Sequence, residues 1–348
     1  MAESARAREE VVAIAGAAAV ANPLENRFLS SMALSKLYEG EAGEAVELAK
    51  AALRLNQTDR LAASIVAASH VQAFDYEGAV SVVSRALQRN PSTGRLMVEL
   101  FSALTANEEG REAVRKELAR HPVWAAPAIY ALARQGNGYQ LVYLLTSGYE
   151  RDPEEGYGQV DRIVARQFTK HGQFRLGYRH FLQLLPAGKK VGYVFNSNFA
   201  DEPSGMPWDW NFTNTTAATV KRVDGDDPHV EVIFRDKPVL RVGFSSYIAV
   251  PPGQLRFRAS ARALDLRSSK PLEFQIDCVD PRRSAIATLE LPSGSYDWKD
   301  FEVEFDNTGL GCRFGNLFLT GRSVKGSFRT RYGGKVEVRS IELLRADY

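Results

Sequence analysis

The sequence predicts a two-part α + β protein, an N-terminal α-helical solenoid followed by an antiparallel β-sandwich. Two observations support this fold class. Apolar residues recur at helical spacing up to residue 186, and from residue 191 onward they alternate at a period of two. We therefore expect a helical domain over residues 3–186 and a β-sandwich domain over residues 191–348.

The composition is that of an ordinary globular protein, with 45% hydrophobic and 25% charged residues and a net charge of +2. This balance does not suit a bulk polyanion binder, and no basic motif interleaved with aromatics is present, so we expect no nucleic-acid partner. No stretch has the length of a membrane span. Residues 11–21 make a poor signal peptide and are expected to form the first helix, which leaves open a membrane anchor upstream of the present start.

The helical part contains an internal repeat. Ala45 and Ala79 lie 34 residues apart, as do Ala52 and Ala86, and a looser third copy ends at Pro122. Further helices are expected over 124–134, 139–150, 158–170 and 174–185. Helix pairs that repeat in this way bury their apolar faces against their neighbours and stack into a solenoid.

This period, with small residues where helices pack, resembles the tetratricopeptide repeat over roughly residues 22–122. The pattern departs from the family in lacking the large aromatic residue of the first helix. The resemblance implies that the helical arm contacts protein partners.

The second part consists of short alternating segments separated by Gly, Pro and Asp turns. Many short strands with no helices between them indicate an antiparallel sandwich. The candidate strands are 191–196, 211–213, 218–223, 229–234, 239–248, 254–263, 272–279, 284–291, 299–306, 314–323 and 334–344.

The order of several motifs resembles the jelly-roll carbohydrate-binding modules of the galactose-binding-like type. These motifs are Phe195-Asn196-x-Asn198-Phe199, Pro207-Trp208-Asp209-Trp210, Tyr247-x-x-Val250, Trp298-x-x-Phe301 and Cys312-x-x-x-Asn316. The resemblance covers nearly all of residues 191–348. It implies a jelly roll that binds a polysaccharide, with a concave sheet face as one common groove.

Strand alternation separates the core side chains from those on the opposite face. On the non-core face it collects planar polar groups beside aromatic rings, which suit the hydroxyl edges and C–H face of a sugar. A merely solvated face with Arg–Asp pairs is the alternative. We expect Trp208 to be a surface stacking residue, and Trp210 and Trp298 to belong to the core. The predicted carbohydrate-binding residues are Trp208, Tyr247, Arg258, Gln275, Asp277, Phe314 and Asn316.

The only two cysteines, Cys278 and Cys312, both fall in the β-part. They fit one disulfide in an oxidising compartment or two buried thiols, and we expect the disulfide. The segment 313–348 is rich in Lys and Arg. It predicts either a solvated sheet face with charged edge strands or a surface for an acidic polymer.

No catalytic machinery is evident, so we expect a protein that is not an enzyme. The five histidines are scattered, and Gln275 stands where a β-sandwich glycosidase of the lichenase type needs a carboxylate nucleophile. No cofactor is expected, apart from a structural calcium for which Asp201, Glu202 and Asp347 are conceivable ligands.

These observations favour a non-catalytic periplasmic or cell-envelope protein in exopolysaccharide synthesis or secretion. Its sandwich would bind the polysaccharide, and its repeats would contact partner proteins of the assembly. The alternative is a purely structural scaffold whose sandwich is a protein-docking module.

Overall fold

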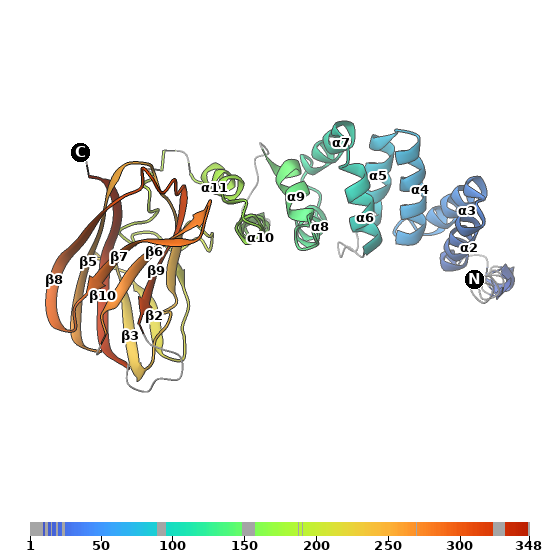
Figure 1. Cartoon of the computed structure of the whole chain (residues 1–348). Helices are drawn as coiled ribbons and strands as arrows, with labels where there is room; N and C mark the ends of the chain where they lie inside the picture. Colours follow the sequence, from blue (N-terminus) through green and yellow to red (C-terminus); the bar gives the residue numbers. More distant parts are fainter. Residues whose placement is uncertain are drawn as a thin grey trace. The chain divides into compact units, whose positions relative to one another are not determined.

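The computed structural model describes residues 25–88, 95–147, 157–186, 188–189, 191–268, 270–322 and 331–346, together with residues 10, 13–14, 16–18 and 20–22. The chain forms two compact units, residues 1–164 and 165–348. Helices make up the first unit, and two antiparallel five-stranded sheets dominate the second (Figure 1). The predicted α + β layout with a β-sandwich is therefore confirmed.

The helical unit repeats as helix pairs. α2, α4 and α6 begin at residues 26, 60 and 95, and α3, α5 and α7 begin at residues 42, 76 and 108. The first two helix pairs are thus 34 residues apart, as the sequence repeat is, and the third pair begins within two residues of that interval. The tetratricopeptide assignment stays a prediction. The described helices are α2 (Asn26–Glu39), α3 (Ala42–Leu55), α4 (Arg60–Gln72), α5 (Tyr76–Leu87), α6 (Arg95–Leu104), α7 (Glu108–Leu118), α8 (Ala125–Ala133), α9 (Gly138–Thr146), α10 (Tyr157–Lys170) and α11 (Phe174–Gln183).

Small residues allow these helices to approach closely. Ala45, Ala52, Ala79 and Ala86 are fully buried, and α4 packs against α3, α5 and, one repeat on, α6. The start of α4 is fixed by Asp59, whose carboxylate accepts a hydrogen bond from the backbone N–H of Ala62 at 3.0 Å. The repeated alanines are therefore packing positions within the helical unit.

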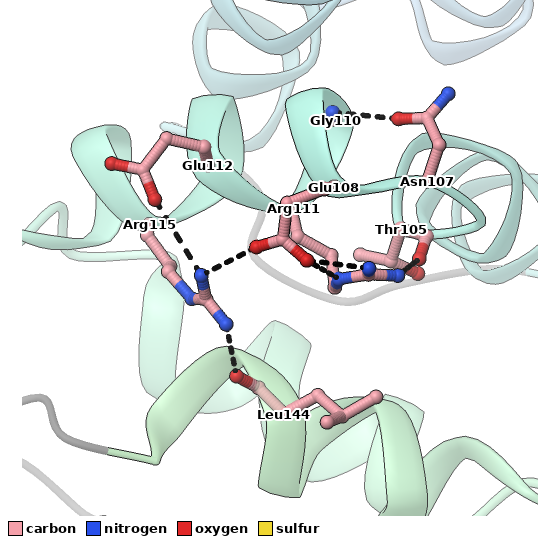
Figure 2. Close-up of polar contacts among 8 residues, drawn as sticks. All are labelled: Thr105, Asn107, Glu108, Gly110, Arg111, Glu112, Arg115 and Leu144. Carbon is pink, nitrogen blue, oxygen red and sulfur yellow. Dashed lines mark hydrogen bonds and ion pairs between the residues drawn. The ribbon is translucent and has the colours of Figure 1, made fainter.

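Side chains of α7 connect this helix to α9 (Figure 2). Asn107 caps α7 by accepting from the backbone N–H of Gly110 at 2.8 Å. Glu108, one residue on, pairs with Arg115 at 3.1 Å. The same guanidinium donates to the carbonyl of Leu144 on α9 at 2.9 Å and so satisfies a carbonyl near the end of that helix.

The sandwich consists of two sheets, here called sheet A, with strand order β1-β4-β9-β6-β7, and sheet B, with order β2-β3-β10-β5-β8 (Figure 1). Their inner faces meet in one core that includes Phe244, Phe257 and Phe274. The strands are β1 (Asn211–Phe212), β2 (Ala218–Val223), β3 (His229–Lys237), β4 (Phe244–Ala249), β5 (Gln254–Arg267), β6 (Leu272–Asp280), β7 (Ser284–Leu291), β8 (Gly294–Asp306), β9 (Phe314–Gly321) and β10 (Tyr332–Arg345).

The predicted first strand, residues 191–196, is wrong because this segment forms turns. Asn196 and Phe199 have φ angles of 50° and 56°, which a strand does not accommodate. The side chain of Asn196 closes the turn by donating to the carbonyl of Asp201 at 2.8 Å and accepting from its N–H at 3.1 Å. Of the apolar residues that suggested a strand, Val194 enters the sandwich core, Phe195 packs in a separate apolar cluster with Phe181, and Val191 is exposed.

The predicted strand 239–248 begins only at Phe244. Gly243 precedes it with a φ of +88°, and a Cβ at this glycine would lie 1.9 Å from the carbonyl oxygen of Thr213. This close approach of two backbones requires glycine and sets the start of β4.

Helix α11 and the last residues of α10 belong to the same compact unit as the sandwich. Phe174 and Phe181 of α11 form a second apolar cluster with Trp208 and Phe314 of the sandwich. The predicted boundary between residues 186 and 191 assigned α11 to the helical domain. In the structure, α11 packs in the unit that contains the sandwich.

The sulfur atoms of Cys278 and Cys312 are bonded, with their Cα atoms 5.7 Å apart. The bond joins β6 to the loop that precedes β9. Asn307 holds the same loop, because its amide donates to the carbonyl of Cys312 at 2.7 Å and its oxygen accepts from the N–H of Cys312 at 3.1 Å.

Candidate functional site

The predicted binding residues fall on two different sheets. Tyr247, Asn316 and Asp277 lie on sheet A, whereas Arg258 lies on β5 of sheet B. Arg258 forms an ion pair with Asp300 of β8. Hydrogen bonding between the two side chains raises the pKa of Arg258 and lowers that of Asp300. Placing Arg258 with the other site residues is therefore wrong, because alternation separates core from surface but does not say which sheet a strand joins.

On sheet A, strand register brings the other polar residues together. Tyr247 on β4 is paired with Asn316 on β9, and Asn316 is paired with Asp277 on β6. In the adjacent row, Gln275 is paired with Phe318. Two neighbouring rows of polar and aromatic side chains thus cross the outer face of sheet A.

The side chains in these rows differ in whether they are hydrogen-bonded to other protein groups. The amide of Gln275 donates a hydrogen bond to the carboxylate of Asp277 at 2.5 Å, so these two side chains are each other's partner. Within the described part of the chain, the hydroxyl of Tyr247 and the amide of Asn316 have no protein hydrogen-bond partner, and both residues are partly exposed. Tyr247 and Asn316 are therefore available for a ligand.

Helix α11 covers two predicted stacking residues. Trp208 is 1% exposed, and its ring stacks on Phe181 with centroids 6.2 Å apart. Phe314 is 8% exposed and lies 5.5 Å from the ring of Tyr178. The prediction that Trp208 is a surface residue is wrong, and Phe314 is covered although it points away from the sandwich core. Both errors follow from assigning α11 to the helical arm.

A cavity of about 620 Å³ adjoins the open part of sheet A, within the range of about 300–1,000 Å³ typical of ligand pockets. Tyr247 and Asn316 line it, while Gln275 and Asp277 are outside its lining. Among the residues at this cavity that sequence reasoning missed, those with polar side chains include Arg166, Thr169, Lys170, Asn211, Arg241 and Ser245.

Two of the missed cations are held in place by local contacts. The guanidinium of Arg241 lies over the ring of Phe318 at 5.0 Å. Arg166, near the end of α10, donates to the carbonyl of Gly205 at 3.2 Å. Sequence reasoning read Arg241 as part of a strand and Arg166 as part of the helical arm, so no local signal connected either residue to Asn316.

Trp298 is also not in the core. It lies half-buried on sheet B, with the guanidinium groups of Arg262 and Arg339 at 4.9 Å and 5.0 Å from its ring. Trp210, by contrast, is 1% exposed and packs in the sandwich core, as predicted.

The described residues contain no group of three or more His, Cys, Asp or Glu side chains that could hold a metal ion. The conceivable calcium ligands Asp201 and Glu202 form ion pairs with Lys189 and Arg222, and Asp347 lies outside the described residues. Within the same described part, no helix combines the length and the apolar character that crossing a membrane requires.

No family model matches the sequence, and no curated protein matches it. Among solved structures, a carbohydrate-binding module of family 4 is 13% identical, with a TM-score of 0.33 over 43% of this chain and 98% of its own. A proposed sugar-binding protein from Bacteroides thetaiotaomicron is 11% identical, with a TM-score of 0.34 over 44% and 100%. A family 61 module in complex with β-1,4-galactotriose is 13% identical, with a TM-score of 0.30 over 45% and 99%. Similarity at this level assigns neither a ligand nor a site to this chain.

Proposed function

We propose that the chain is a non-catalytic protein that binds a polysaccharide in the cavity on the outer face of sheet A. The observation that carries this proposal is the paired Tyr247 and Asn316 in the lining of a cavity of about 620 Å³. An aromatic ring can stack on the C–H face of a sugar, and an amide can both donate to and accept from its hydroxyl groups.

The charges around the cavity favour binding over hydrolysis. Glycoside hydrolysis uses two carboxyl groups that flank the scissile bond. No Asp or Glu is among the described residues that line the cavity. The nearby Asp277, on the strand that pairs with that of Asn316, accepts a hydrogen bond from Gln275. The arrangement supports recognition of a sugar chain without cleavage.

For the whole chain, we propose a periplasmic or cell-envelope role in exopolysaccharide synthesis or secretion. The Cys278–Cys312 bond suits an oxidising compartment. The repeated helix pairs suit contact with partner proteins. A cavity of about 350 Å³ on the helical unit, lined in part by Lys50, Arg54 and Arg85, is a candidate surface for such a partner.

A protein-docking scaffold is the second candidate, and Trp298 on sheet B favours it. Tryptophan and arginine are enriched at interfaces, and here a half-buried Trp298 lies beside Arg262 and Arg339. In this alternative, the outer face of sheet B around Trp298 is the protein-binding surface, and the cavity on sheet A has no glycan ligand.

Affinity gel electrophoresis of the full chain against neutral and acidic polysaccharides tests the proposal. We expect at least one polymer to retard the parent, and the variants Asn316→Ala and Tyr247→Phe to be retarded less. Tyr247→Phe keeps the ring and its contact with Phe174, so it tests the hydroxyl alone, which has no protein partner within the described residues and would bond a sugar hydroxyl. Arg258→Ala, on sheet B, is the control; relative to its own migration in a polymer-free gel, it should be retarded as much as the parent.

Thermal unfolding of each variant shows whether it is folded. Retardation of the parent with unchanged retardation of both sheet A variants would move the binding site away from the cavity. No retardation by any polymer would favour the scaffold.

A further inference from the structure

We infer that the cavity on sheet A selects an acidic sugar unit, an inference that rests on the proposed glycan-binding function. Three basic side chains line the cavity: Arg166 and Lys170 from the end of α10, and Arg241 from the segment before β4. All three residues are exposed, and no acidic residue is among the described lining residues. The local charge is therefore positive.

The charges of two of these cations are not compensated by the protein. Within the described residues, neither Lys170 nor Arg241 forms an ion pair with a carboxylate. Arg166 uses one N–H for the carbonyl of Gly205, which leaves other donors of its guanidinium open. On sheet B, by contrast, Arg256 pairs with Glu304 and Arg258 with Asp300.

The helix alone does not explain this arrangement. A lysine in the last turn of a helix is favoured by the helix dipole, which could account for Lys170. Arg166, four residues earlier, lies on the same side of α10, and like charges at this spacing repel each other. Arg241 comes from a different segment and still lines the same cavity. An anion between the three cations would relieve this repulsion.

The remaining polar lining suits the neutral part of a sugar. Asn211, Ser245 and Asn316 offer hydroxyl and amide groups, and Tyr247 offers a ring. The cations would bind the anionic substituent through charge-assisted hydrogen bonds. The ligand class is therefore a polysaccharide whose units carry a carboxylate or a sulfate group.

The test uses the full chain in affinity electrophoresis with polygalacturonate for the carboxylate, dextran sulfate for the sulfate, and dextran and galactan as uncharged polymers. The double variant Lys170→Gln/Arg241→Gln removes two charges at the cavity. Lys237→Gln/Arg282→Gln, two exposed residues elsewhere on the sandwich unit, makes the same change in net charge.

We expect the cavity variant to bind one or both acidic polymers roughly tenfold more weakly, because the two lost charge contacts are exposed and therefore screened by solvent. The control pair should bind like the parent. Which acidic polymer responds distinguishes a carboxylate from a sulfate as the recognised group.

Three results would overturn the inference, and the first two of them leave the proposed function standing. The first is a parent that binds uncharged polymers as well as acidic ones, together with a cavity variant that behaves like it. The second is binding to uncharged polymers alone. If both double variants bound the acidic polymers equally more weakly than the parent, the attraction would come from the charge of the whole surface, and this result would also overturn the inference. Binding to none of the polymers would contradict both the inference and the proposed function.

Discussion

Gly177 on α11 lies directly against the ring of Trp208. A Cβ atom at Gly177 would lie 2.5 Å from Cη2 of Trp208 and 3.0 Å from Cβ of Phe168. Because contacts of that length do not occur without movement of the neighbours, only a glycine fits here. The contact makes α11 part of the same packed unit as the sandwich, and it explains why Trp208 is buried.

Gly177→Ala should therefore destabilise the sandwich unit. Alanine in place of a helical glycine normally stabilises by up to about 1 kcal/mol, but overpacking of this kind costs roughly 1–3 kcal/mol. Denaturant unfolding followed by tryptophan fluorescence measures the change. Gly43→Ala on α3, where nothing lies within 4 Å of the added Cβ, is the matched control and should be neutral or stabilising. A stabilising Gly177→Ala would show that α11 does not pack on Trp208.

Arg222 holds the turn segment before β1 against β2. Its Nε donates to the carbonyl of Phe199 at 2.6 Å, and its Nη2 donates to that of Ala200 at 2.8 Å. A lysine side chain cannot donate to both carbonyls. Arg222→Lys should therefore lower the free energy of unfolding by roughly 1–2 kcal/mol and speed amide hydrogen exchange over residues 195–202. Unchanged exchange in that segment would contradict this role of the guanidinium.

Glu337 on β10 makes the stability of the sandwich depend on pH. Burial alone would raise its pKa, but hydrogen bonds from Lys335, at 2.6 Å, and from Arg262 outweigh burial and lower the pKa below the ordinary 4.5. A carboxyl group with a lowered pKa in the folded state stabilises the fold above the unfolded pKa. This contribution is lost as the pH falls through the lowered folded value.

Glu337→Gln should therefore reduce the free energy of unfolding at neutral pH by roughly 1–3 kcal/mol, because it leaves Arg262 without its carboxylate partner and Lys335 with Glu231 alone. The difference from the parent should shrink as the pH falls below 4.5, the ordinary value for the carboxyl. Denaturant titrations across this pH range measure it. Glu302→Gln, an exposed residue on β8, is the control and should have little effect at any pH. A difference for Glu337→Gln that stays constant with pH would contradict the account.

The bond between Cys278 and Cys312 should stabilise the sandwich by restricting its unfolded state. For a sequence separation of 34 residues, the chain-entropy model gives a stabilisation of about 3–4 kcal/mol from the disulfide. The double variant Cys278→Ala/Cys312→Ala should lose about this much stability, and thiol titration of the denatured parent should find no free thiol. Two titratable thiols would instead support the alternative of two buried cysteines.

Local patterns predicted the strands well and their arrangement poorly. The segments 218–223 and 284–291 were predicted with the bounds of β2 and β7, because side-chain alternation is a property of each strand by itself. The turn at Asn196 was missed because its apolar neighbours resemble a strand. Sheet membership was missed because strand pairing is a relationship between distant segments, which alternation does not record.

The same distinction holds for the candidate site. Tyr247 and Asn316 were found from the sequence because each lies on the non-core side of its own strand. Arg166 and Lys170 were missed because they lie on a helix that the sequence assigned to the other part of the chain. Only the packing of the second unit brings this helix end and sheet A to one cavity.

Hydrogen–deuterium exchange of the full chain, with and without polygalacturonate, tests most directly whether the cavity on sheet A binds an acidic glycan. The account predicts slower exchange at residues 166–170, 205–211 and 241–247, with helices α2 to α9 and the strands β5 and β8 unchanged. Slower exchange confined to β5 and β8 around Trp298, or to the helical unit, would contradict it.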